Sequence, residues 1–136
     1  MGSMQDLIRN QRLIRNFNDL TGLRFGNIYP TDIDGFLEIR NKLFIFIETK
    51  FGDSPIPAGQ ATALTNLADA IHNPEKEKFA YVLLVSHDCA DTIDVASGWV
   101  TKYRANGKWI DVADLGYSAF DFVYNLIELH IGHDKI

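Results

Sequence analysis

One cysteine is all that this 136-residue sequence contains, and it has neither a long apolar run nor an excess of basic charge. Cys89 cannot form an internal disulfide, which suits a reducing compartment, and we expect the cytoplasm. No apolar stretch approaches the roughly 20 residues of a membrane-spanning helix, so we expect no membrane insertion. The net charge of −5 argues against broad coating of nucleic acid, although it leaves room for a local basic patch.

The length fits one domain with one hydrophobic core. Apolar residues make up 46% of the chain and charged residues 23%, which is ordinary for a globular protein. The tripeptide of residues 1–3, ahead of a second methionine at Met4, resembles an expression remnant. We therefore expect a single domain over residues 4–136.

Apolar periodicity predicts three helices, over residues 5–20, 58–72 and 118–131. In the second helix, Gln60 lies one step ahead of an apolar stripe, so we expect its side chain to point toward the sheet. The third helix opens at Ser118 and Asp121, which resemble a capping box with Asp in place of Glu.

Strand patterns cover residues 24–29, 32–39, 43–50 and 79–85, and a further hairpin turns at Asn106 and Gly107. A turn centred on Asn41 would place Asp34 opposite Glu48, and Asp32 opposite Lys50, on one face. The rest of this first hairpin is apolar on both faces, so we expect it to be central and covered on both sides. The run 79–85 is expected to lie parallel to a neighbour after a helical crossover. The element order predicts an α/β domain with a mixed central β-sheet flanked by helices.

The residue types at the end of the first hairpin point to phosphoryl chemistry. Two carboxylates that face each other across a hairpin, Asp34 and Glu48, offer the oxygen ligands that Mg²⁺ or Mn²⁺ prefers. Lys50 shares their face and could stabilise a phosphate or hold an attacking water. Simpler interpretations stay open: an ion pair at a strand end, turn-forming aspartates, and a glutamine at a helix start.

Asp34, the sequence Glu48-Thr49-Lys50 and the helix-borne Gln60 together resemble the motifs of the PD-(D/E)XK nuclease superfamily. The resemblance covers residues 5–88, while the later hairpin and last helix lie outside it. It implies a restriction-endonuclease-like αβββαβ core and a nuclease that uses Mg²⁺ or Mn²⁺ to hydrolyse phosphodiester bonds, most plausibly in DNA. The family's first motif is often Pro-Asp; here Pro30 does not directly precede an aspartate, so Asp32 stays a rival to Asp34.

The resemblance also implies a role for each matched residue. Asp34 and Glu48 would bind the metal, with Asp32 as the rival ligand and the backbone carbonyl of Thr49 as a further one. Lys50 would assist the water or the transition state, and Gln60 would support it.

Several basic and aromatic residues are candidate contacts to nucleic acid, although a solvated face or core packing also explains them. The basic ones are Arg9, Arg12, Arg15, Lys102, Arg104 and Lys108; the aromatic ones are Trp99, Tyr103 and Trp109. His130 and His133 have a metal-like spacing but no evident third ligand, so we expect satisfied or surface histidines. We expect a short nuclease to form a homodimer or to join a larger complex. The alternative is a non-catalytic subunit or protein-binding module with the same fold, which the acidic charge favours.

Overall fold

The computed structural model describes residues 21–28, 30–52, 58–88 and 93–132, with the backbone alone for residue 21 and residues 58–61. The chain forms two compact units, residues 1–31 and residues 32–136. The predicted helix over residues 5–20 lies outside the described residues. No helix in the described ranges is both long and apolar enough to span a membrane.

The described part of the first unit is a short turn segment. The 3-10 helix η2 (Thr21–Leu23) is followed by a tight turn in which Phe25 and Ile28 exchange two backbone hydrogen bonds, of 2.8 and 3.0 Å. Gly26 adopts a positive φ of 62° there, which glycine tolerates without strain. The predicted strand over 24–29 is therefore wrong in its described part, because the chain reverses at Gly26 instead of extending.

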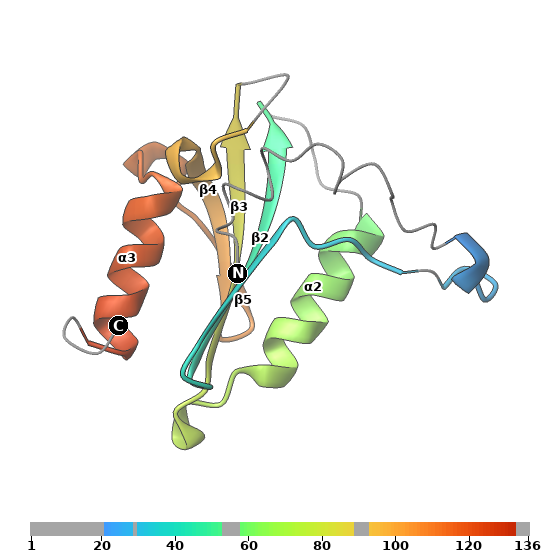
Figure 1. Cartoon of the computed structure of the whole chain (residues 1–136), viewed down its shortest axis with the longest axis horizontal. Helices are drawn as coiled ribbons and strands as arrows, with labels where there is room; N and C mark the ends of the chain where they lie inside the picture. The colour runs from blue at the N-terminus through green and yellow to red at the C-terminus, as the bar shows by residue number, and fades with distance from the viewer. Residues whose placement is uncertain (1–20, 29, 53–57, 89–92, 133–136) are drawn as a thin grey trace, which may run out of the picture. The chain divides into compact units, whose positions relative to one another are not determined.

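The second unit is built on a mixed five-stranded sheet in the order β1-β2-β3-β4-β5 (Figure 1). Strands β2 and β3 are parallel, and the other neighbouring pairs are antiparallel. The strands are β1 (Gly35–Ile39), β2 (Leu43–Phe51), β3 (Phe79–His87), β4 (Trp99–Ala105) and β5 (Lys108–Asp111). The α/β class, the mixed sheet and the parallel pair formed across the helical crossover are confirmed.

The first hairpin has the predicted register, because Phe36 pairs with Phe46 around a turn that holds Arg40 and Asn41 at positive φ. Its extent differs from the prediction. β1 begins at Gly35, so Asp32 and Asp34 precede the strand and do not form ladder pairs with Lys50 and Glu48.

The prediction that the whole hairpin is covered on both faces holds for β2 alone. Residues 43 and 45–48 of β2 are buried, whereas Phe36 and Leu37 of β1 are 52% and 39% exposed. The reason is position: β1 is the edge strand of the sheet, and β2 lies inside it.

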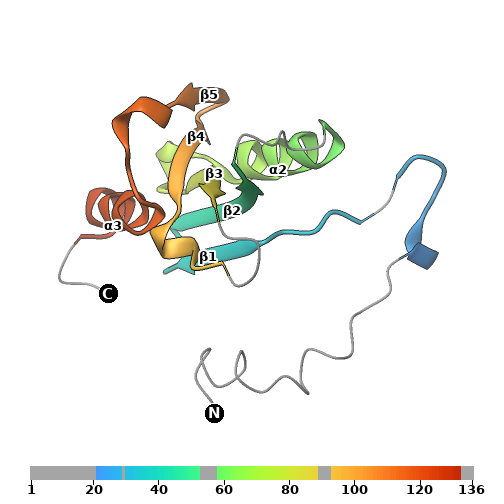
Figure 2. The same ribbon diagram turned by 90° about the horizontal axis from the view of Figure 1, so that it is seen from above.

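Two helices cover the two faces of this sheet (Figures 1 and 2). Helix α2 (Ala58–Ile71) packs Leu64 and Ala68 against Phe46, Ala80 and Val82. Helix α3 (Ala119–His130) covers the opposite face. The core there includes the following buried residues: Leu43, Ile45, Ile47, Leu83, Val85, Val100 and Leu126. Each fully buried leucine or isoleucine stabilises the fold by roughly 1.5–3 kcal/mol.

Local signals set the ends of the remaining elements as predicted. The Ser118 hydroxyl accepts a 3.0 Å hydrogen bond from the backbone N–H of Asp121 and caps α3. Asn106 and Gly107 both adopt positive φ, which is the conformation that a two-residue hairpin turn requires. The hairpin of β4 and β5 follows from that turn.

Candidate functional site

The carboxyl end of β2 carries the two charged residues of the motif on the face that α2 covers. Phe46 packs against α2, and side chains alternate along a strand, so Glu48 and Lys50 share this face. Glu48 is only 5% exposed. Burial fixes the position of this carboxylate near the end of a central strand, where it stays a candidate ligand.

Asp34 is tied to the same strand end through Thr49, whose side chain lies on the face opposite Glu48 and Lys50. Its Oδ2 atom accepts hydrogen bonds from the backbone N–H of Thr49, at 2.8 Å, and from the Thr49 hydroxyl, at 2.9 Å. The last backbone pair of this hairpin is Gly35 with Ile47, so the Asp34 carboxylate continues the contact where the ladder stops. The structure thus brings the aspartate to the residue that lies between Glu48 and Lys50.

Lys50 lies next to β3, where its partner in the parallel register is Ser86. Among the residues that the structure describes, the Lys50 ammonium makes no hydrogen bond or ion pair. The ends of the two strands are tied together just beyond it, because Ser86 donates to the Gly52 carbonyl at 3.0 Å and the Gly52 N–H donates to the His87 carbonyl at 2.8 Å. The backbone that carries Lys50 is therefore fixed on its β3 side.

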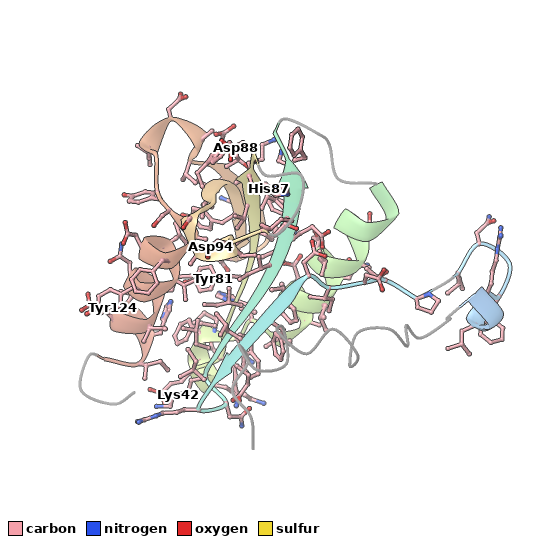
Figure 3. The ribbon with its side chains drawn as sticks, turned by 45° about the horizontal axis from the view of Figure 1, so that its top comes forward. Lys42, Tyr81, His87, Asp88, Asp94 and Tyr124 are labelled. Carbon is pink, nitrogen blue, oxygen red and sulfur yellow. The ribbon has the colours of Figure 1, made fainter. Side chains whose placement is uncertain are left out.

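His87 and Asp88 end β3 at the same edge of the sheet (Figure 3). His87 pairs with Phe51 in the register and lies edge-on to its ring, with the centroids 5.7 Å apart. Alternation places both side chains on the face opposite Glu48 and Lys50. His87 is buried, and its Nδ1 makes no hydrogen bond within the described part of the chain.

The donor atoms at this end of the sheet suit a hard cation. Asp34, Glu48 and the Thr49 carbonyl are all oxygen donors, which is the ligand type of Mg²⁺ and Mn²⁺. Within the described ranges no three His, Cys, Asp or Glu side chains gather as a metal-binding group. The fit to a divalent ion thus rests on two carboxylates and a backbone carbonyl.

Other predicted site residues are placed less fully. Gln60 lies in the first turn of α2, as predicted, but its side chain lies outside the described part of the structure. Asp32 is exposed and stands ahead of β1. The three N-terminal arginines, Arg9, Arg12 and Arg15, also lie outside the described residues.

Of the basic residues on the second hairpin, Arg104 is already engaged. It forms a two-pronged ion pair with Asp69 of α2, with distances of 2.7 Å (Nη2 to Oδ2) and 3.3 Å (Nε to Oδ1). That hydrogen bonding raises the pKa of Arg104. Lys102 and Lys108 are exposed and stay candidates for phosphate contacts.

The aromatic candidates divide between core and surface. Tyr103 packs in the core against Phe122, with ring centroids 5.0 Å apart. Trp99 and Trp109 are 37% and 36% exposed, so their rings are partly accessible.

His130 is a satisfied histidine, as predicted. Its Nε2 lies 2.6 Å from the Tyr81 hydroxyl, and its ring stacks on Phe79 at 3.9 Å. Burial, and then the proximity of His72, lower the pKa of His130. Burial likewise raises the pKa of Tyr81. His133 lies outside the described residues.

Sequence reasoning missed the place of Ser86 at this end of the sheet. Ser86 is 1% exposed and adjoins Lys50 only because β2 and β3 are parallel and in this register. The sequence signal was the polar pair Ser86 and His87 after a fully apolar run, which is typical of a strand that ends at a site.

No family model, no curated protein and no solved structure matches this chain. The geometry of its own residues therefore carries the functional argument.

Proposed function

We propose that this chain is a Mg²⁺- or Mn²⁺-dependent nuclease that hydrolyses phosphodiester bonds, with DNA as its substrate. The observation that supports the proposal is the attachment of Asp34 to Thr49, the residue between the buried Glu48 and Lys50, which ties a second carboxylate to the strand end that carries them. Two carboxylates and a lysine at the end of one buried strand are the residue types that phosphate hydrolysis needs. The finer architecture, a restriction-endonuclease-like core, belongs to the same proposal.

Each residue has a distinct task in this proposal. Asp34, Glu48 and the Thr49 carbonyl would hold the ion, which when bound offsets charge on the phosphate and makes a bound water more acidic. Glu48 is suited to this task because its burial in β2 fixes its position. Both hydrogen bonds to Asp34 fall on Oδ2, so Oδ1 stays available as a ligand atom.

Lys50 supplies positive charge where negative charge develops during hydrolysis. Its ammonium would donate hydrogen bonds to the attacking water or to a phosphate oxygen, and such preorganised donors contribute several kcal/mol to catalysis. Gln60, in the first turn of α2, would orient that water. The strand ends tied at Gly52 limit the motion of the Lys50 backbone.

The proposal includes the setting in which such an enzyme would act. A short acidic chain gains affinity for DNA by pairing with a second copy or by joining a larger complex, since few basic side chains are available for phosphate contacts. A single cysteine is compatible with the reducing cytoplasm.

The test is cleavage of labelled single-stranded, duplex, flap, four-way-junction and RNA substrates in Mg²⁺, Mn²⁺ or EDTA. We expect metal-dependent cutting by the wild type, and a loss of about 10³-fold in the Glu48→Gln and Lys50→Met variants. Glu38→Gln is a matched control, because Glu38 lies on the same face of the hairpin but near the turn, where it accepts a hydrogen bond from the Asn41 N–H. Lys76→Met, in the exposed η3 helix (Pro74–Lys76), is the control for Lys50.

Full activity in Glu48→Gln, or no cutting of any substrate by folded wild-type protein, would contradict the nuclease proposal.

One observation favours the second candidate, a non-catalytic subunit or protein-binding module. The Asp34 carboxylate is bonded to Thr49 instead of joining a three-ligand cluster, and the described residues hold no such cluster. A folded protein without metal-dependent activity would support that candidate.

A further inference from the structure

A bulge in β4 decides which face of the sheet Trp99 occupies. Leu84 of β3 pairs with Lys102, but the next residue, Val85, pairs with Val100, so Thr101 is an extra residue in β4. In a regular strand, side chains three residues apart point to opposite faces. The bulge removes that alternation, and Trp99 and Lys102 share one face.

That face is the one that carries Glu48 and Lys50. Leu84 packs against the α2-side core, and it is the register partner of both Glu48 and Lys102. Trp99 pairs with Ser86, which in turn pairs with Lys50. Neighbouring strands lie about 4.8 Å apart, so the Trp99 backbone is roughly 10 Å from that of Lys50.

The backbone around Trp99 is fixed on both sides. Gly98 approaches β3 so closely that an added Cβ would lie 2.8 Å from the Ser86 carbonyl oxygen, so only glycine fits there. The Gly98 carbonyl accepts a hydrogen bond from the Ala119 N–H, at 2.8 Å, and the Val100 N–H donates to the Tyr117 carbonyl, at 2.9 Å. The bulged Thr101 is tied as well, because its carbonyl accepts a 2.8 Å hydrogen bond from the Val112 N–H.

We propose that Trp99 is a stacking platform for an unpaired base next to the cleaved phosphate, and hence that the substrate is single-stranded at the site. This inference rests on the proposed nuclease function. β-Bulges occur next to active sites, where they re-aim a side chain. Trp99 keeps 37% of its surface exposed, and its backbone is fixed. It lies in the row of Lys50, which is the set of register-paired residues Lys50, Ser86 and Trp99. These are the features of a base-stacking residue. Lys102, exposed on the same face, would contact a flanking phosphate.

Trp109 provides a matched control within the chain. It is 36% exposed and lies on the same face, since it pairs with Arg104, which in turn pairs with Val82. Their register partners on β3, Ser86 and Val82, are four residues apart, so Trp109 lies about 13 Å farther along the strand direction. The two tryptophans thus share residue type, exposure and face, but only Trp99 lies in the row of Lys50.

The experiment measures binding of a labelled 12-nucleotide single strand and of the matching duplex in EDTA, where no cleavage occurs. We expect Trp99→Ala to weaken single-strand binding about tenfold, to leave duplex binding unchanged, and to be largely rescued in Trp99→Phe. Trp109→Ala should bind both ligands as the wild type does. The chain has two tryptophans, so a Trp109→Phe variant also reports stacking directly, as quenching of Trp99 emission by the single strand.

Equal single-strand affinity in wild type and Trp99→Ala, an equal loss in Trp109→Ala, or no single-strand binding by the wild type would each overturn the stacking role. These outcomes are separate from the nuclease proposal. If Trp99 does not affect binding but Glu48-dependent cleavage is intact, only the stacking role of Trp99 is contradicted. If binding depends on Trp99 but no metal supports cleavage, the stacking role stands and the nuclease proposal is contradicted.

Discussion

Polar side chains at the two ends of the central strands behave differently. At the turn end (residues 38–42 and 72–80), they complete the backbone: Glu38 accepts from the Asn41 N–H at 2.6 Å, and His72 Nδ1 accepts from the Ala80 N–H at 3.0 Å. At the site end (residues 48–52 and 84–88), Ser86 and Asp34 also complete backbone groups. Glu48, however, is buried inside a central strand there, and Lys50 has no partner among the described residues. Figure 3 shows Lys42 at the first end and His87 with Asp88 at the other.

The difference separates side chains that stabilise the fold from side chains that folding stability does not explain. A side chain that satisfies a backbone group contributes about 1 kcal/mol and is explained by folding alone. Burial of a carboxylate carries a desolvation cost, and Lys50 makes no hydrogen bond or ion pair among the described residues. Charged groups in such positions are common at functional sites, which is why we place the site there.

We expect the largest difference in stability between the turn end and the site end from substitution of two histidines, His72 and His87. His72→Phe leaves the N–H of Ala80, a residue only 1% exposed, without its acceptor, and we expect the free energy of unfolding to fall by about 1–3 kcal/mol. His87→Phe should change it little, because the His87 Nδ1 has no hydrogen bond within the described ranges. Urea unfolding of both variants measures the contrast; equal losses, or a larger loss in His87→Phe, would remove the distinction between the ends.

A smaller effect is the pH dependence that His130, packed against Phe79 and Tyr81, gives to the free energy of unfolding. Burial lowers the pKa of His130 from its ordinary value of 6.5, so the unfolded chain binds the proton more readily than the folded one. The stabilising contribution is therefore complete above pH 6.5 and is lost as the pH falls through the lower folded-state pKa.

Unfolding at pH 7.5 and pH 5.5 tests this pH dependence in the wild type and in His130→Gln, whose side chain does not titrate. The variant should lose less stability than the wild type between the two pH values. An identical loss in both proteins would show that another group is responsible.

Much of the local structure followed from the sequence, because turn and helix signals act over short distances. The hairpin register came from one turn around Asn41, the second hairpin from Asn106 and Gly107, and the start of α3 from the Ser118 cap. These features depend on residues that are neighbours in the chain.

Features that depend on distant partners did not follow. Strand β1 begins later than its pattern suggested, since the Asp34 side chain bonds to Thr49 where a ladder pair was expected. Its position at the sheet edge, which leaves Phe36 half exposed, comes from the strand order of the whole sheet. The bulge at Thr101 has no local signature, so the face occupied by Trp99 was open until β3 and β4 were paired.

The most direct test of the claim that the site end binds a metal ion is Mn²⁺ binding, measured by titration calorimetry. The proteins compared are the wild type, Glu48→Gln and Glu38→Gln. The measurement needs no knowledge of the substrate and reads the carboxylates themselves. We predict that wild type and Glu38→Gln bind the ion alike and that Glu48→Gln binds it at least about tenfold more weakly. Equal binding by all three proteins, or none by the wild type, would contradict the assignment of Glu48 as a metal ligand.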